Sequence, residues 1–261
     1  MLLSVAPMAG YTDQAFRMMC QSFGADEAVT EMVSGRALYH GDQKSGRLME
    51  TDPSEKGVTL QIFGSEPEIL ADVTKNILNH RDDYVCIDIN MGCPVKKVRK
   101  TGAGASLMEN PKLAAKIVAT TKRVAAKYDK PVSVKFRTRL EEGGPGSLEA
   151  PEFAVYLAEA GVDLITVHGR TAEQFYRGDA DWAFMPLVRD ALDQAGFTHI
   201  PLVGNGDIDS AETLKQRMKQ GACQAYMVGR AAQAAPWIFS ELRASLDGAP
   251  WTAPDSAERC R

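Results

Sequence analysis

Eight short apolar runs recur at nearly even intervals along this chain, and their spacing restricts the fold more than any other feature. Each run is followed by polar or glycine-rich residues and then by a stretch with helical periodicity. The runs cover residues 2–6, 28–33, 58–63, 84–89, 132–137, 164–168, 200–203 and 225–228. The chain has 261 residues, which leaves roughly 33 residues for each strand–helix unit, as in parallel βα barrels.

We therefore expect an α/β fold, a (βα)8 TIM barrel formed by residues 1–246, with a C-terminal tail over residues 247–261. The strands are short, and polar residues collect directly after them, where the active-site loops of such barrels lie. The same order of elements would also suit an open, doubly wound sheet, which remains the alternative.

Side chains with the spacing of helix caps precede three of the expected helices. They are Thr12 or Asp13, Ser65 with Glu68, and Asp209 with Glu212. The first of these helices is expected to carry Phe16, Met19 and Phe23 on its apolar side. The glycine-rich segment 143–147 is predicted to be a flexible loop.

The composition excludes several classes of protein. The formal net charge is −4, so a surface that binds a polyanion must be a local patch. The five cysteines are an odd number without a CxxC pair, which argues against a disulfide framework and against a zinc site, and we expect no bound metal. No apolar stretch has the length of a membrane span, and the first residues lack a signal peptide, so we expect a cytoplasmic protein with no membrane contact.

A cysteine lies in a constrained turn directly after the fourth expected strand. Residues 88–97 read Asp-Ile-Asn-Met-Gly-Cys-Pro-Val-Lys-Lys, so Gly92 and Pro94 flank Cys93. Basic residues follow at once, and nearby positive charge with partial exposure makes a thiol reactive. The alternative is a half-buried structural cysteine, because a free cysteine is usually a small inert hydrophobe.

Polar and glycine residues at the ends of the other strands should meet at one mouth of the barrel. The ends carry Pro7, Met8, Ala9, Gln61, Asn90, Lys135, His168, Asn205, Gly206, Asp207, Gly229 and Arg230. The last two ends are glycine-bearing turns that precede helices, and together with a cation they are typical of a phosphate cradle.

The remaining strand-end residues suggest what the phosphate belongs to. A lysine at position 135, inside a barrel mouth, needs an anionic or electron-rich partner because its burial is costly. Taken singly, His168 could be a satisfied core histidine and Gln61 a buried amide bonded to the backbone. Together, opposite a phosphate cradle, they suggest a cofactor with a polar ring system and one phosphate, which flavin mononucleotide (FMN) fits. No GxGxxG follows the first strand, so a dinucleotide fold is not expected.

Basic residues after several strands are candidates for binding phosphates. They are the cluster at residues 96–100, which includes Lys97, together with Arg137, Arg139, Arg170 and Arg177. Since the net charge is acidic, these side chains could equally be solvated surface residues. The polar, aromatic segment 168–182 could likewise be a binding loop or a solvated loop anchored by Trp182.

These segments together resemble the tRNA-dihydrouridine synthase family of bacterial type, over nearly the whole chain. The resemblance lies in residues 6–10 (Ala-Pro-Met-Ala-Gly) with 12–13, 61–64, 90–94 with 97–98, 102–105, 134–135, 167–171, 205–207 and 229–230. It implies an enzyme with bound FMN that reduces selected uridines of tRNA to 5,6-dihydrouridine, with NADPH or NADH as the reductant.

The resemblance also assigns roles to residues. The family's FMN contacts would fall on Pro7, Met8, Ala9, Gln61, Lys135, His168, Asn205, Gly206, Asp207, Gly229 and Arg230. Its proton donor would be Cys93, since a thiol with a reference pKa of about 8.5 is protonated at neutral pH and can still donate. We assign substrate binding to Asn90, Lys97, Arg137 and Arg170.

The chain differs from the family pattern at both ends. It begins at the first strand, and after residue 246 only a short tail remains where the family usually continues into a helical domain that helps to hold tRNA. We expect residues 1–246 to be the FMN-binding catalytic domain and residues 247–261 to be the start of that missing domain. We also expect a monomer that acts on tRNA.

Two other functions remain open at this point. The chain could be an FMN barrel oxidoreductase that acts on a free pyrimidine or another small molecule. It could also be a catalytically weak barrel that binds tRNA.

Overall fold

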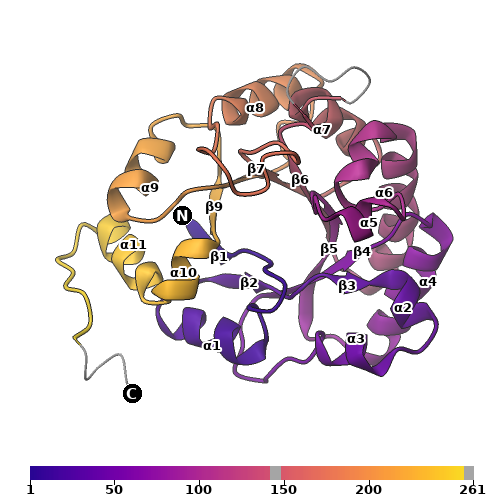
Figure 1. The fold of residues 1–261 in the computed structure, drawn as a ribbon, viewed down its shortest axis with the longest axis horizontal. Coiled ribbons are helices and arrows are strands. Elements are labelled where there is room, and N and C mark those ends of the chain that lie inside the picture. Colours follow the sequence, from indigo (N-terminus) through magenta and orange to yellow (C-terminus); the bar gives the residue numbers. More distant parts are fainter. Residues whose placement is uncertain (142–147, 256–261) are drawn as a thin grey trace.

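The computed structural model describes residues 1–141 and 148–255, and it has the predicted (βα)8 architecture (Figure 1). The parallel sheet has the strand order β2-β1-β9-β8-β7-β6-β5-β4-β3, and pairing of β2 with β4 closes it into a barrel. The strands are β1 (Leu2–Val5), β2 (Glu27–Val29), β3 (Val33–Ser34), β4 (Val58–Phe63), β5 (Tyr84–Met91), β6 (Val132–Arg137), β7 (Leu164–His168), β8 (Leu202–Asn205) and β9 (Ala225–Val228). The open-sheet alternative is therefore wrong.

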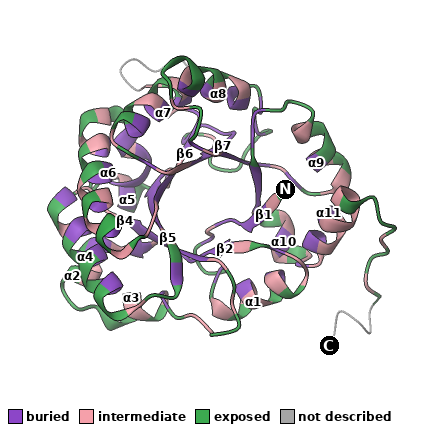
Figure 2. Cartoon of the chain, turned by 180° about the vertical axis from the view of Figure 1, so that it is seen from behind, coloured by how far each residue is buried: buried purple, intermediate pink, exposed green. Residues whose placement is uncertain are grey.

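Helices surround the barrel, with their buried faces toward the strands and their exposed faces outward (Figure 2). They are α1 (Gln14–Ser22), α2 (Gly35–Tyr39), α3 (Gln43–Arg47), α4 (Pro67–His80), α5 (Lys96–Arg99), α6 (Pro111–Ala125), α7 (Ala150–Glu159), α8 (Phe184–Gln194), α9 (Ala211–Met218), α10 (Arg230–Ala234) and α11 (Ile238–Asp247). Two 3₁₀ helices cover Gly104–Glu109 and Ala126–Tyr128. Within the described part of the chain, no helix combines the length and apolarity needed to cross a bilayer.

The second predicted strand, residues 28–33, is in fact two short strands. β2 pairs with β1 and β4, whereas β3 pairs with β4 alone. Between them the hydroxyl of Thr30 accepts from the backbone N–H of Gln61 at 3.0 Å, where a strand carbonyl would otherwise lie. The side chain of Thr30 thus takes over a ladder hydrogen bond and interrupts the strand.

The predicted caps were right in one case and wrong in two. Asp13 caps α1 by accepting from the backbone N–H of Phe16 at 2.9 Å. Ser65 does not cap α4, because its hydroxyl donates to the carbonyl of Thr101 instead, and α4 has no side-chain cap. The helix α9 is capped by Ser210, in a capping box with Thr213, and not by the residue before it.

Three further expectations are corrected or untested. Met19 was expected on the apolar side of α1 but is 48% exposed. The seventh strand runs from Leu202 to Asn205, two residues later than the predicted 200–203. The predicted flexible loop at residues 143–147 lies outside the described residues.

Polar side chains fill the part of the barrel interior that lies toward the carboxyl ends of the strands. Side chains alternate along a strand, so every second residue shares the interior face. The pairs are Thr59 and Gln61 in β4, Asp88 and Asn90 in β5, Ser133 and Lys135 in β6, and Thr166 and His168 in β7. All but Lys135, which is partly exposed, are buried. This end of the barrel therefore carries an unusual amount of buried polarity, and it is where the candidate site lies.

Candidate active site at the barrel mouth

A cavity of about 690 Å³ opens at the carboxyl ends of the strands. All eleven residues expected to bind the cofactor line it, from Pro7, Met8 and Ala9 after β1 round to Gly229 and Arg230 after β9. Cys93, Asn90 and Arg137 line it as well. Of the residues assigned to substrate binding, Lys97 and Arg170 do not line this cavity: Lys97 is exposed on α5, and Arg170 is buried behind the wall.

Several lining residues are not among the site residues expected from the sequence. They include Tyr11, Met32, Phe175, Tyr176, Asp209 and Gln233. Tyr176 lies in the polar, aromatic segment 168–182. The sequence indicates that segment as a candidate binding loop but assigns no role to Tyr176 itself. Met32 reaches the cavity because the strand is interrupted between β2 and β3. The sequence pattern did not indicate this interruption.

Lys135 and Asn205 meet across the barrel interior. The ammonium of Lys135 donates to the side-chain oxygen of Asn205 at 2.9 Å, and the Asn205 amide donates to the Met227 carbonyl at 2.8 Å. Burial, assisted by the positive charge of Arg137, lowers the pKa of Lys135 to about 7, although Asp88 acts in the opposite direction. Lys135 can therefore be either a cation or a neutral amine near physiological pH.

His168 lies at the end of β7 in the same wall and is buried. Burial is the largest effect on its pKa, and the nearby cations, Lys135 first among them, act in the same direction. The pKa of His168 is held well below its usual value, so the ring is neutral at physiological pH. A neutral imidazole can donate through one nitrogen and accept through the other.

Cys93 lies in the turn after β5, with its backbone held on both sides. Its N–H donates to the side-chain oxygen of Asn90 at 2.9 Å, and its carbonyl accepts from Ala105 at 3.0 Å. Gly104 packs against it with φ +62°, and a Cβ at position 104 would lie 2.7 Å from the Cys93 carbonyl oxygen. The turn thus requires a glycine at position 104, eleven residues after Cys93.

The thiol of Cys93 is protonated at neutral pH. Burial raises its pKa, and this outweighs the opposing effects of a backbone hydrogen bond at Val95 and the charge of Arg137. The expectation that basic neighbours would activate the thiol is therefore wrong for this conformation. An un-ionised thiol is suited to donate a proton, not to attack as a thiolate.

Arg137 connects the Cys93 turn to the loop after β7. Its guanidinium donates to the carbonyls of Gly92 at 3.0 Å, Thr171 at 2.8 Å and Phe175 at 2.9 Å. Phe175 has a left-handed backbone, with φ +53°, and its ring is exposed at the cavity mouth. Arg137 therefore contributes to the architecture of the mouth as well as to its charge.

Asp207 binds two cations, Arg170 and Arg230, on the side of the cavity where the phosphate cradle is expected. It accepts two hydrogen bonds from Arg170, at 2.8 and 2.7 Å, one from Arg230 at 2.7 Å and one from the backbone of Ala180 at 2.8 Å. Burial would raise the pKa of Asp207, but these hydrogen bonds and the two arginine charges lower it overall. Arg170 thus acts on the cavity through Asp207, whereas Arg230 reaches the lining and lies over the ring of Tyr176, 5.0 Å from its centroid.

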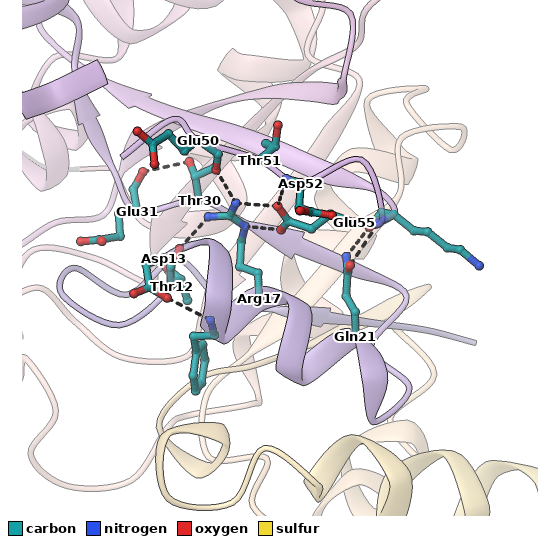
Figure 3. Close-up of polar contacts among 12 residues, drawn as sticks. Thr12, Asp13, Arg17, Gln21, Thr30, Glu31, Glu50, Thr51, Asp52 and Glu55 are labelled. Carbon is teal, nitrogen blue, oxygen red and sulfur yellow. Dashed lines mark hydrogen bonds and ion pairs between the residues drawn. The ribbon is translucent and has the colours of Figure 1, made fainter. Parts of the chain in front are cut away.

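The turn after β1 is held by a buried ion pair (Figure 3). Arg17 is 0% and Glu55 is 1% exposed at the side chain, and two hydrogen bonds of 2.8 and 3.0 Å join them. Arg17 also donates to the carbonyl of Thr12 at 2.9 Å, and the Thr12 hydroxyl accepts from the N–H of Met8 at 3.0 Å. Glu31 accepts from the N–H of Gly10 in the same turn. The charged side chains of Arg17, Glu55 and Glu31, on the side of the turn away from the cavity, therefore hold the cavity-lining residues 7–9 in place.

A second, smaller groove lies next to the Cys93 turn. It is lined by Lys96, Arg99 and Lys100 of the α5 region and by Ser106. Lys96 lies three and four residues before Arg99 and Lys100, a spacing that puts the three cations on one helix face, and Lys97 is not part of this lining. Arg99 is partly neutralised by Glu109, at 3.5 Å. A basic groove of this kind suits a polyanion.

Comparison with known proteins gives a consistent result. Residues 4–260 match the model of the family described as dihydrouridine synthase. The chain is 39% identical over 253 residues to tRNA-dihydrouridine synthase B of Shewanella oneidensis, covering 97% of this chain and 74% of that protein. It is 37% identical to the protein of the same name from Xanthomonas campestris, covering 91% and 68%. Among solved structures, a 2-naphthoyl-CoA reductase complex is similar in fold, with a TM-score of 0.63, 10% identity, and coverage of 95% of this chain and 50% of that one.

Proposed function

This chain belongs to the dihydrouridine synthase family, and from that premise we propose that it reduces specific uridines in tRNA to 5,6-dihydrouridine, with bound FMN and with NADPH or NADH as the reductant. One observation supports this most strongly. The residues that would bind the flavin, drawn from six strand ends, line a single cavity that also contains the thiol of Cys93.

The cavity fits a flavin mononucleotide in size and in chemistry. Its volume of about 690 Å³ lies inside the range of roughly 300–1,000 Å³ that is usual for cofactor sites. Gln61, Lys135 and His168 would hold the polar ring system, because between them they offer neutral and cationic donors. The turns at Gly206 and at Gly229 with Arg230 would hold the phosphate. When bound and reduced, the flavin supplies a hydride to C6 of uracil, and NADPH or NADH restores it.

Cys93 would complete the reaction by protonating the other carbon. The C5=C6 bond of uracil is conjugated with a carbonyl, so addition at C6 leaves negative charge on C5 and O4. The thiol of Cys93 holds a proton because burial raises its pKa, and it would transfer that proton from Sγ to C5 as a general acid. The partly enclosed cavity limits competition by water.

The tRNA must present its uridine outside the helical stack, which costs a few kcal/mol. Asn90 and Arg137 line the cavity and would contact the base, whereas Lys97 is exposed on α5 and would contact the RNA backbone. Arg170 would act through Asp207. We propose a cytoplasmic monomer in which residues 1–246 form the catalytic domain.

Replacement of Cys93 tests this proposal directly. Cys93→Ala should retain the bound flavin, seen in its visible spectrum, and should still oxidise NADPH. Dihydrouridine formation in unmodified tRNA should fall by about 100-fold or more, since general acid catalysis contributes roughly 10²–10⁴ in rate.

Cys223→Ala is the matched control, because that thiol is buried away from the cavity. An undiminished dihydrouridine yield in Cys93→Ala would refute the proton-donor role. Wild-type protein that reduces free uridine as fast as tRNA would favour a small-molecule oxidoreductase, and colourless protein that still binds tRNA would favour a catalytically weak binding barrel.

A further inference from the structure

We propose that Asp88 is a positioning residue whose carboxylate sets the direction of a hydrogen-bond relay that holds the Cys93 turn. The relay runs from Asp88 through the side chains of Gln61 and Asn90 to the backbone of Gly92 and Cys93. Its consequence for uridine reduction rests on the function proposed above, whereas the relay itself does not.

The relay begins at a carboxylate inside the barrel. Asp88 is 4% exposed and lies in β5, opposite Gln61 in β4 and Ser133 in β6. One of its oxygens accepts from the Ser133 hydroxyl at 2.6 Å, and the other accepts from the Gln61 amide nitrogen at 2.7 Å. Burial raises the pKa of Asp88, while the hydrogen bonds from Ser133 and Gln61 and the charge of Lys135 oppose the rise. The oxygen that faces Gln61 is an acceptor, so Gln61 presents its NH₂ group to Asp88.

That requirement fixes the next two links. With its nitrogen turned to Asp88, Gln61 presents its oxygen to Asn90, whose amide nitrogen donates at 2.9 Å. The Asn90 oxygen therefore faces the backbone N–H groups of Gly92 and Cys93, at 3.1 and 2.9 Å. Backbone N–H groups can only donate, so the far end of the relay demands the same orientation as the near end.

The hydrogen bond that Asp88 accepts from the Ser133 hydroxyl is consistent with the same donor-to-acceptor direction. Ser133 uses its proton for Asp88 and accepts from the thiol of Cys86 at 3.3 Å. This bond lies on the side of Asp88 away from the Cys93 turn. Ser133 therefore provides a control that touches the same carboxylate without being part of the relay.

The relay matters because the Asn90 oxygen is the side-chain group that accepts from the N–H groups of this turn, whereas Arg137 binds its Gly92 carbonyl. Loss of an acceptor at position 88 frees the Gln61 amide to rotate, and a rotated Gln61 would present NH₂ to the NH₂ of Asn90. Asn90 would then rotate as well and turn its NH₂ toward two backbone N–H groups. The turn would open, and a displacement of about 1 Å at the thiol is enough to lower a rate by about 100-fold.

Hydrogen exchange in the protein without flavin provides a direct test. Asp88→Leu should make the amides of Gly92 and Cys93 exchange at least tenfold faster, with strand amides elsewhere unchanged. Cys93 should react several-fold faster with iodoacetamide, and the uridine reduction rate, measured at saturating FMN, should fall at least tenfold. Ser133→Ala should leave both amides as in wild type.

A compensating variant separates this role from a general contribution to packing. In Asp88→Leu/Asn90→Asp, the new carboxylate can accept from the two backbone N–H groups and from a rotated Gln61 at once. Amide protection at Gly92 and Cys93 should return to within about threefold of wild type, which a packing role would not predict. If Asp88→Leu does not fold, Gln61→Met breaks the middle link and should accelerate the same two amides.

Wild-type exchange at Gly92 and Cys93 in a folded Asp88→Leu or Gln61→Met protein would overturn the relay, as would failure of the double variant to restore protection. These outcomes are independent of the proposed activity. If exchange and alkylation change as expected but no uridine is reduced by wild-type protein, the relay stands and the proposed function fails.

Discussion

Two turns at the mouth of the barrel face the same cavity but are held in different ways. The turn after β1, residues 7–12, is fixed from behind by the buried ion pair of Arg17 and Glu55 (Figure 3). The N–H groups of the turn after β5 are held by neutral amides, with the carboxylate of Asp88 at the far end of that chain of bonds, and its Gly92 carbonyl is held by the guanidinium of Arg137. The difference separates a support that contributes to fold stability from one that mainly sets the position of a reacting atom.

Once the chain is folded, Arg17 and Glu55 cannot readily exchange each other for another partner. Arg17 also donates to the carbonyls of Thr12 and Glu50, so α1, the first turn and the segment before β4 are tied to one guanidinium. Removal of either charge leaves the other buried without a partner. The amides of the β5 turn can instead rotate, so their failure would misplace Cys93 before it unfolds the barrel.

The largest effect should come from breaking the charged support. Arg17→Met should lower the free energy of unfolding by about 3–5 kcal/mol, because Glu55 would remain as an uncompensated buried charge. Urea denaturation followed by circular dichroism measures this.

Arg36→Met is the matched control for that experiment. Arg36 and its partner Glu66 are both exposed and lie 3.7 Å apart, and exposed pairs contribute only about 0–1 kcal/mol. A loss below about 1 kcal/mol in Arg17→Met would show that the first turn does not depend on its ion pair.

The next effect concerns the tightness of the β5 turn. In Gly104→Ala the new Cβ would meet the Cys93 carbonyl at 2.7 Å and would require φ +62° of an alanine. Overpacking and the left-handed backbone together should cost about 2–4 kcal/mol. The same variant should also reduce dihydrouridine formation, because the clash acts on Cys93 itself.

Gly102→Ala distinguishes backbone strain from contact with Cys93. Gly102 also has a positive φ, +75°, but its Cβ would lie 3.5 Å from Ser65, an ordinary contact. It should cost only about 1 kcal/mol and leave dihydrouridine formation unchanged. Equal losses of activity in both variants would mean that the close contact at Cys93 is not the cause.

Much of the site could be predicted from the sequence because the strand ends are marked locally. Apolar runs ended by glycine, proline or a polar residue fix where each strand stops, and a closed barrel then brings all the ends together. The eleven residues expected to bind FMN come from six strand ends and nonetheless line one cavity. Even the two-residue error in β8 did not matter, because Asn205 lies at the mouth in either case.

The features that were missed depend on partners far away in the sequence. Ser65 has the local spacing of a capping residue, but its hydroxyl is used by Thr101, 36 residues later. Asp88 carries no local signal of its role, because its partners Gln61 and Ser133 lie 27 and 45 residues away. The raised pKa of the Cys93 thiol likewise follows from burial, which a count of neighbouring basic residues does not reveal.

A different kind of effect should appear as a pH dependence of stability at the Lys135 side of the mouth. Lys135 has a pKa of about 7 in the folded protein and about 10.4 in an unfolded chain. Between these values the unfolded state binds more protons, so this group makes the free energy of unfolding rise with pH. Below about pH 7 both states are charged, and the penalty for burying the ammonium is fully present.

Lys135→Met should therefore gain stability relative to wild type at pH 6, and the gain should shrink steadily by pH 10. Urea denaturation of the flavin-free protein across this range measures it, with Lys97→Met on the exposed face of α5 as the control. The quantity to follow is the difference in the free energy of unfolding between variant and wild type at each pH. The raised pKa values of Cys20, Cys86, Cys93 and Cys223 lower stability above about pH 8.5 in both proteins. A difference that does not change with pH would show that Lys135 is not a buried, titrating amine.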